Sequence, residues 1–170
     1  MLTIGIIGIM SAIAVVQVGT AQQAIRSDGG LRVAIAQMNL ARELAISQRR
    51  NMQVQLLGTN AIRIVRNDVP AGTTQLASVV FEGSVEYSLV PGVPDTPDAF
   101  GRTKAVDFGG AASVMFTSEG MLVDAAGNPI NGTIFLAVHG AANSVRAVTI
   151  LGATGRVRGY RWNGLQWTRL

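Results

Sequence analysis

The first sixteen residues of the chain, MLTIGIIGIMSAIAVV, contain no charged side chain. Apart from Thr3 and Ser11, every residue in this stretch is apolar or glycine. As an α-helix the stretch would extend about 24 Å, which is shorter than the roughly 20-residue helix that crosses a bilayer. A folded domain does not leave such a surface in water, so we expect lipid or another protein chain to cover it.

The remainder of the 170 residues is long enough to form one domain with its own core. The chain contains 14 Lys or Arg, 10 Asp or Glu and no cysteine, which excludes disulfides and thiolate chemistry. Its 20 glycines and few aromatic residues are typical of a turn-rich β domain. Because no cationic segment precedes the apolar stretch, we expect this segment to be retained and not removed as a signal peptide.

Helical periodicity returns after Gly30 and continues to about Arg50. One apolar stripe at helical spacing consists of Leu31, Ala34, Ile35, Met38, Ala41 and Ala45. We expect a second stripe, consisting of Val33, Leu40 and Leu44, on nearly the opposite side of the helix. Two stripes need two partners, so the first is expected to pack on the chain's own β domain and the second on another subunit.

Glycines weaken the centre of this helical region. Gly19 and the pair Gly29 and Gly30 each cost about 1 kcal/mol of helix stability relative to alanine. We therefore predict one helix of about fifty residues that is broken or kinked near its middle.

From residue 51 the apolar pattern changes to the period of a β-strand. Residues 52–57 and 61–65 flank Gly58-Thr59-Asn60 and predict a hairpin, whereas residues 91–101 and 123–132 predict surface loops. Further strands are expected at residues 76–81, 85–90, 105–108, 113–117, 133–138 and 145–151. The predicted fold is α+β, with a long N-terminal helix packed on a small antiparallel β-sandwich-like head.

The predicted organisation has two parts. Residues 1–26 form a hydrophobic helix for a filament core or a membrane, and residues 27–170 form the globular head. Within the head, residues 27–50 are the amphipathic second half of the helix and residues 51–170 are the β domain.

The C-terminal segment predicts a hairpin with a two-residue turn at Asn163-Gly164. In that register Trp162 faces Leu165, Tyr160 faces Trp167 and Arg158 faces Arg169. One face of the ribbon then carries Arg156, Arg158, Tyr160, Trp162, Leu165, Trp167 and Arg169. Arginines that alternate with aromatic rings can bind nucleic acid, and the same residue types are common in protein interfaces, so both interpretations stay open.

The sequence contains no pattern typical of catalysis. His139 is the only histidine, and no second histidine or cysteine completes a metal site. The acids Asp95, Asp98, Asp107 and Asp124 leave a calcium-binding loop as an alternative, although they do not have EF-hand spacing. We predict a protein that is not an enzyme and that has no cofactor and no metal.

Three stretches are similar to a known family. IGIIGIMSAIA at residues 4–14 resembles the N-terminal helix of the type IV pilin and type II secretion pseudopilin superfamily. LARELAISQRRNMQVQL at residues 40–56 resembles the sequence that ends the long helix in the GspH/FimT class of that superfamily. Residues 116–138 and the segment VTILGATGRVRG at residues 148–159 are similar to the C-terminal half of the same class.

The resemblance implies a structural subunit of a type IV pilus-like or pseudopilus filament in the bacterial cell envelope. Such a subunit is held in the inner membrane before assembly and then polymerises with copies of itself or with other pilin-like subunits, driven by an assembly ATPase. The expected filament-core residues are Leu2, Ile4, Ile6, Ile7, Ile9, Met10 and Ile13. The expected second subunit contact consists of Val33, Leu40 and Leu44.

The chain departs from the family at its start. Members begin with an FTLIEL-like hexapeptide that contains a glutamate, whereas this chain has Gly5 at that position when aligned on its first residue. Either the sequence starts late, so that Met1 is not the mature N-terminus, or this subunit assembles without the glutamate contact. We favour the late start, because the match at residues 4–14 is much better.

Two other functions remain open. The chain could be a low-copy minor pilin or pseudopilin that binds DNA or a secreted substrate through Arg156, Arg158, Tyr160, Trp162, Trp167 and Arg169. In some minor pilins of DNA uptake a Gly-Arg-x-Arg motif is associated with DNA binding, and residues 155–158 match it. The second alternative is an adhesin-like pilin that uses the loop at residues 91–101.

Overall fold

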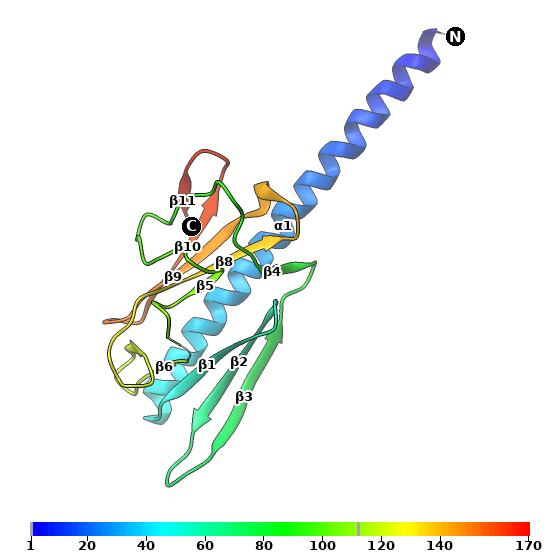
Figure 1. Cartoon of the computed structure of the whole chain (residues 1–170). Coiled ribbons are helices and arrows are strands. Elements are labelled where there is room, and N and C mark those ends of the chain that lie inside the picture. Colours follow the sequence, from blue (N-terminus) through cyan, green and yellow to red (C-terminus); the bar gives the residue numbers. More distant parts are fainter. Residues whose placement is uncertain (1, 112) are drawn as a thin grey trace.

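A single helix dominates the computed structural model. The structure describes the backbone of residues 2–111 and 113–170. Side chains are described for residues 21–111 and 113–170, and the exposure of Gly19 is also described. Helix α1 (Leu2–Gln48) has 47 residues, so it is about 70 Å long. Its first half extends away from the head, and its second half lies against the strands (Figure 1). The predicted long helix is confirmed, but the predicted break or kink in its middle is wrong.

Gly30 shows why the helix continues through its glycines. A Cβ atom at Gly30 would lie only 2.7 Å from Cγ1 of Val85, whereas a Cβ atom at Gly29 would meet open space. Gly30 therefore allows a close approach between the helix and a strand. This packing helps the helix to continue through Gly29 and Gly30, although each glycine costs roughly 1 kcal/mol relative to alanine.

The strands form two antiparallel sheets that both contact α1. The five-stranded sheet has the order β3-β2-β1-β6-β7, with β1 (Met52–Leu57), β2 (Ala61–Asn67), β3 (Thr73–Val80), β6 (Val114–Phe116) and β7 (Leu122–Val123). The six-stranded sheet has the order β11-β10-β9-β8-β4, with β5 paired to β8. Its strands are β4 (Val85–Tyr87), β5 (Val106–Asp107), β8 (Gly132–Val138), β9 (Arg146–Leu151), β10 (Arg156–Trp162) and β11 (Trp167–Arg169), and the short helix η1 (Ala142–Ser144) lies between β8 and β9.

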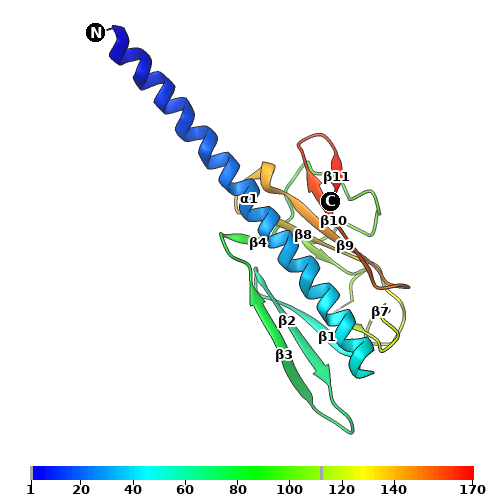
Figure 2. The ribbon, with the colours of Figure 1, turned by 180° about the vertical axis from the view of Figure 1, so that it is seen from behind.

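The predicted α+β fold is confirmed, and strands occur in all of the predicted regions. The hairpin around Gly58-Thr59-Asn60 is present, because β1 pairs with β2 from Leu57 and Ala61 outward. Seen from behind, α1 lies in front of both sheets (Figure 2), so one side of the helix is covered by strands and the other side is not.

Both apolar stripes of α1 face the head. In the first stripe, Leu31, Ala34, Met38, Ala41 and Ala45 are fully buried, and Ile35 is half-buried. The second stripe of Val33, Leu40 and Leu44 is half-buried and packs against the same core.

The second stripe therefore does not lie opposite the first. At about 100° per residue the two stripes are centred roughly 130° apart, and both pack against the core of the head. The expectation that the second stripe needs another subunit as its partner is wrong. A subunit contact to the exposed parts of these three side chains stays a prediction.

The C-terminal hairpin has a different turn from the predicted one. Trp162 pairs with Trp167 and Tyr160 with Arg169, so the loop has four residues, 163–166. The side-chain oxygen of Asn163 accepts hydrogen bonds from the backbone N–H groups of Leu165 (2.9 Å) and Gln166 (2.8 Å). Asn163 therefore opens a turn held by its own side chain, in place of a two-residue turn. Relative to the predicted pairing, the second strand of the hairpin is shifted by two residues. Because side chains alternate between the two faces of a strand, this shift leaves the paired residues on their predicted face. Leu165 lies exposed at the tip of the loop.

The adjacent glycines of α1 give a matched test of this packing. We expect Gly29→Ala to raise the free energy of unfolding by up to about 1 kcal/mol, because alanine favours the helix. Gly30→Ala should lower it by about 1–3 kcal/mol, because the added methyl group overlaps with buried Val85. Urea unfolding of the purified full chain in mild detergent measures both, and equal effects of the two changes would contradict the described contact.

Candidate functional site

The projecting half of α1 carries the predicted filament-core residues. Leu2, Ile4, Ile6, Ile7, Ile9, Met10 and Ile13 lie in this part of the helix, and their side chains are outside the described residues. Their role in a filament core stays a prediction. Among the described residues, which do not include those side chains, no helix is long and apolar enough to cross a membrane.

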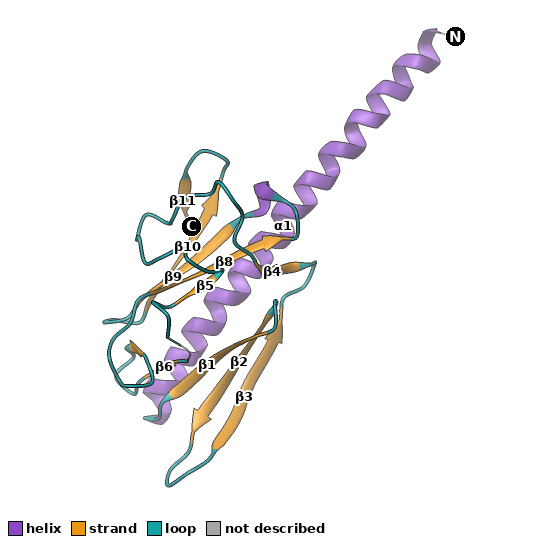
Figure 3. Ribbon diagram, in the orientation of Figure 1, coloured by secondary structure: helices purple, strands orange, loops and turns teal. Residues whose placement is uncertain are grey.

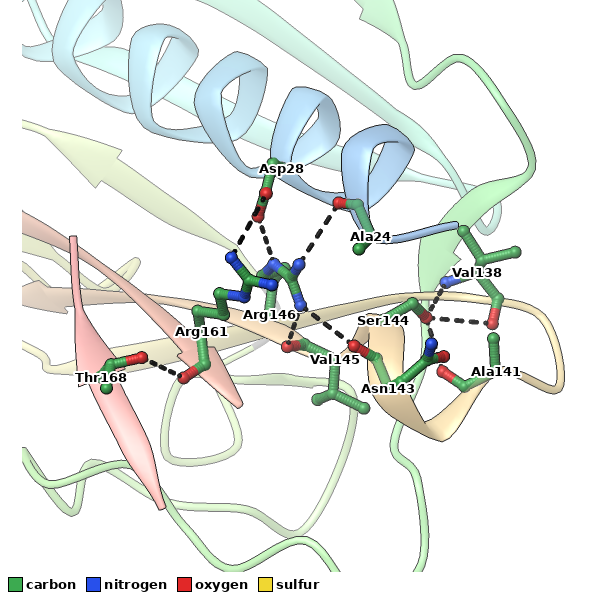
Figure 4. A network of polar contacts seen from close by, with 10 residues as sticks. All are labelled: Ala24, Asp28, Val138, Ala141, Asn143, Ser144, Val145, Arg146, Arg161 and Thr168. Atoms are coloured by element: carbon green, nitrogen blue, oxygen red, sulfur yellow. Dashed lines mark hydrogen bonds and ion pairs between the residues drawn. The ribbon is translucent and has the colours of Figure 1, made fainter. Parts of the chain in front are cut away.

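A buried arginine joins α1 to the six-stranded sheet near the point where the helix leaves the head (Figure 4). The side chain of Arg146 on β9 is completely buried, and its Nε donates a hydrogen bond of 2.5 Å to Oδ1 of Asp28 on α1. Its Nη2 donates to the carbonyl oxygen of Ala24 at 3.3 Å, and its Nη1 donates to the carbonyl oxygens of Val145 at 3.0 Å and Asn143 at 3.4 Å. This network fixes the helix relative to β9.

The surrounding polar groups hold this arginine in place. Ser144 accepts a hydrogen bond from the backbone N–H of Val138 (2.9 Å) and donates one to the carbonyl oxygen of Ala141 (2.6 Å), which orders the turn before β9. Nη1 of Arg161 on β10 lies 4.0 Å from Oδ2 of Asp28. No sequence pattern predicted this site. Its only local signal is one arginine at the start of an otherwise apolar strand, RAVTIL.

The predicted binding face of the hairpin is covered by the chain itself. Residues 88–105 form a long loop without strands or helices between β4 and β5, and part of it lies against β10 and β11 (Figure 3). Tyr160 and Trp162 are buried, and Trp162 packs with Val93 of the loop. Trp167 is half-buried, and its Nε1 donates a hydrogen bond to the carbonyl oxygen of Pro94 at 3.1 Å.

Asp98 is the polar centre of this contact. Its carboxylate accepts hydrogen bonds from Thr149 Oγ1 at 2.6 Å, from the Tyr160 hydroxyl at 2.9 Å and from Nη1 of Arg158. Burial by itself raises the pKa of Asp98, but the hydrogen bonds from Thr149 and Tyr160 and the charge of Arg158 outweigh it. The pKa of Asp98 is therefore held below its ordinary value of 3.8.

This arrangement limits which of the predicted binding residues are accessible. Base stacking needs accessible rings, but the rings of Tyr160 and Trp162 are buried and Arg158 is paired with Asp98. Of the predicted DNA-binding residues, Arg156 and Arg169 are exposed. The predicted surface loop at residues 91–101 is present, with Val93 and Thr96 turned into the head and Pro91, Gly92, Pro94, Pro97 and Ala99 exposed.

The other predicted polar residues have local structural roles. Asp95 accepts hydrogen bonds from the backbone N–H groups of Thr96 and Gly101, and Asp107 accepts from those of Thr103 and Gly109. Residues 124–128 form a turn in which the Asp124 carboxylate accepts backbone N–H groups. The exposed side chain of His139 contacts Glu86 at 2.8 Å. Within the described residues, no three acidic or histidine side chains form a group that could hold a metal ion.

Two solved structures have a similar architecture. The type IV minor pilin FimU from Pseudomonas aeruginosa has a TM-score of 0.53 and 18% sequence identity, over 76% of this chain and 84% of that chain. The minor pseudopilin EpsH from the type 2 secretion system of Vibrio cholerae has a TM-score of 0.52 and 13% identity, over 82% of this chain and 97% of that chain. No family model and no curated protein matches the chain.

These comparisons define the class by its fold. A helix packed on antiparallel sheets is shared with this minor pilin and this minor pseudopilin. The chain therefore has the fold of the type IV pilin and type II secretion pseudopilin superfamily, and the resemblance predicted from its sequence is confirmed at this level. At these sequence identities the likeness concerns the fold alone.

The contact between Arg146 and Asp28 is expected to stabilise the head. Asp28→Ala should lower the free energy of unfolding by about 3 kcal/mol, because it leaves a buried guanidinium without its counter-ion. The double variant Asp28→Ala/Arg146→Met should lose less, because the buried charge is removed as well. Urea unfolding tests this, with Glu119→Ala at an exposed position as the control. A double variant that is less stable than Asp28→Ala would contradict the expectation.

The contact of Asp98 predicts acid sensitivity of the loop. Because the folded pKa of Asp98 is lowered, its stabilisation is complete above the ordinary pKa of 3.8 and is lost as the pH falls through the lower folded value. The two tryptophans of the chain both lie at the loop, so acrylamide quenching of their fluorescence reports its position. We expect quenching to rise below about pH 4 in the wild type and already at pH 7 in Asp98→Asn. Asp124→Asn, in an exposed turn, is the control, and unchanged quenching in Asp98→Asn would refute the role of Asp98.

Proposed function

We propose that the chain is a subunit of a type IV pilus-like or pseudopilus filament that polymerises through the first half of α1. The observation that carries this proposal is the continuous helix whose uncharged first half extends beyond the head (Figure 1). The fold shared with a minor pilin and a minor pseudopilin supports it. The filament would belong to the bacterial cell envelope, and the subunit would be held in the inner membrane before an assembly ATPase drives polymerisation.

The physical basis of polymerisation is helix packing. Apolar side chains that move from lipid to a protein core gain little hydrophobic free energy, because both surroundings are apolar. Close packing has to supply the attraction, and residues 1–16 contain small side chains that let helices approach closely. These are Gly5, Gly8, Ser11, Ala12 and Ala14. The heads then add the contacts that select the correct partners.

A low-copy role is the second candidate. FimU is described as a minor pilin and EpsH as a minor pseudopilin, so the two neighbours favour a minor subunit. Binding of DNA or of a secreted substrate by the hairpin would now depend on Arg156 and Arg169, because the rings and Arg158 are engaged by the loop. The amount of this chain relative to the other subunits in purified filaments distinguishes a major from a minor subunit.

An apolar residue in the projecting helix tests polymerisation. We expect Ile9→Asp to remove the chain from the sheared filament fraction of the producing cells, because a carboxylate in an apolar helix core costs several kcal/mol. Ile9→Leu keeps the apolar volume and should assemble like the wild type. Immunoblots of the filament and membrane fractions measure the distribution. Normal assembly of Ile9→Asp would contradict a core position for this residue.

A further inference from the structure

The helix has one face that the head leaves open. Viewed from behind, this side of α1 is turned away from both sheets (Figure 2). The exposed residues follow one another at helical spacing and are Ile25, Gly29, Arg32, Ala36, Asn39 and Glu43. We call these six residues the outer face. Its largest apolar member, Ile25, is 70% exposed.

The outer face carries two unpaired charges of opposite sign. Within the part of the chain that the structure describes, neither Arg32 nor Glu43 has an ion-pair partner. Two other charged residues of α1 are engaged by the head, since Asp28 pairs with Arg146 and Arg42 donates a hydrogen bond to the carbonyl oxygen of Gly120. The chain is poor in acids, with 10 Asp and Glu in total, so a free glutamate on this face is notable.

The spacing of these charges fits a second copy of the helix. Glu43 follows Arg32 by eleven residues, which is about three helical turns, so both lie on the same face about 16 Å apart. A parallel copy shifted by that distance places its Glu43 beside Arg32 of the first copy. The same shift places its Ala36 beside Ile25, so an apolar contact accompanies the ionic one. Gly29 and Ala36 are small and allow the two helices to approach closely.

From this complementarity we infer that the outer face docks on a second copy of this chain with a stagger of about eleven residues. Arg32 of one copy pairs with Glu43 of the next, and Ile25 packs against Ala36. The inference rests on the proposed function, because a filament core formed by the first halves of α1 keeps the helices parallel. In the proposed filament the heads lie on the outside, and the outer face of each α1 is turned toward the filament axis.

Disulfide crosslinking tests the stagger directly, because the natural chain contains no cysteine. The full-length double variant Arg32→Cys/Glu43→Cys should form a ladder of crosslinked multimers when filaments are oxidised. A bond within one copy is excluded, because the two Cα atoms are about 16 Å apart and a disulfide needs about 4.4–6.8 Å. The second pair, Ile25→Cys/Ala36→Cys, should form the same ladder. The single variants allow dimers at most.

The control pair is Arg32→Cys/Asn39→Cys, which lies on the same face but is one turn shorter. It should give no ladder, because its stagger is about 6 Å too small. A ladder from both eleven-residue pairs and none from the control supports the inference. Filaments that contain the variants but give no ladder with either pair overturn the stagger and leave the proposed function intact. Wild-type chain that never enters filaments overturns the proposed function, and the inference with it.

Charge reversal provides an independent measurement. Arg32→Glu and Glu43→Arg should each reduce the filament fraction severalfold, because each places like charges side by side. The double variant Arg32→Glu/Glu43→Arg restores the opposite charges and should recover assembly. Lys104→Glu, at an exposed lysine in the loop of residues 88–105, is the matched control for a charge change elsewhere. Single variants that assemble normally, or a double variant that fails while the Lys104→Glu control assembles, would contradict the pairing.

Discussion

The packing of one side of α1 against both sheets is the contact on which the rest of the head depends. Neither sheet has more than six strands, and their apolar faces meet on the same buried helical residues. Gly30 and Gly159 permit this close packing, since a Cβ atom at Gly159 would lie 2.7 Å from Cδ1 of Ile35. Arg146 and Asp28 add a polar contact near the point where the helix leaves the head. The direction of the projecting half is therefore fixed by the head.

The same packing explains the long loop. The face of β10 that contains Gly159 lies against the helix, so the aromatic residues on the other face need a different cover. Residues 88–105 supply it, with Val93 against Trp162 and Asp98 bound to Arg158 and Tyr160. The rings of Tyr160 and Trp162 are thus part of the interior, whereas Arg156 and Arg169 stay exposed. The outer face of α1 is also exposed, and we propose a contact between copies there.

The sequence by itself determined where the helix and the strands form. The uncharged first sixteen residues, the helical period of residues 31–50 and the alternation in β1 and β2 are local patterns, and each predicted its element correctly. Local patterns suffice here because helix and strand periods depend on neighbours within a few residues. The resemblance to pilins and pseudopilins added the arrangement of these elements, which the comparisons confirm as a fold.

Only the tertiary structure decided which surfaces are free. Asp28 and Arg146 are 118 residues apart, and Asp98 and Arg158 are 60 residues apart, so no local pattern could pair them. The second stripe of α1 was predicted to need another subunit as its partner, but it packs against the core of the head and is half-buried there. The hairpin at Asn163 has a four-residue loop in which the Asn163 side chain accepts two backbone hydrogen bonds, and not the common two-residue Asn-Gly turn. The sequence thus determined which residues form the helix and strands, and burial between distant segments decided which of their faces remain exposed.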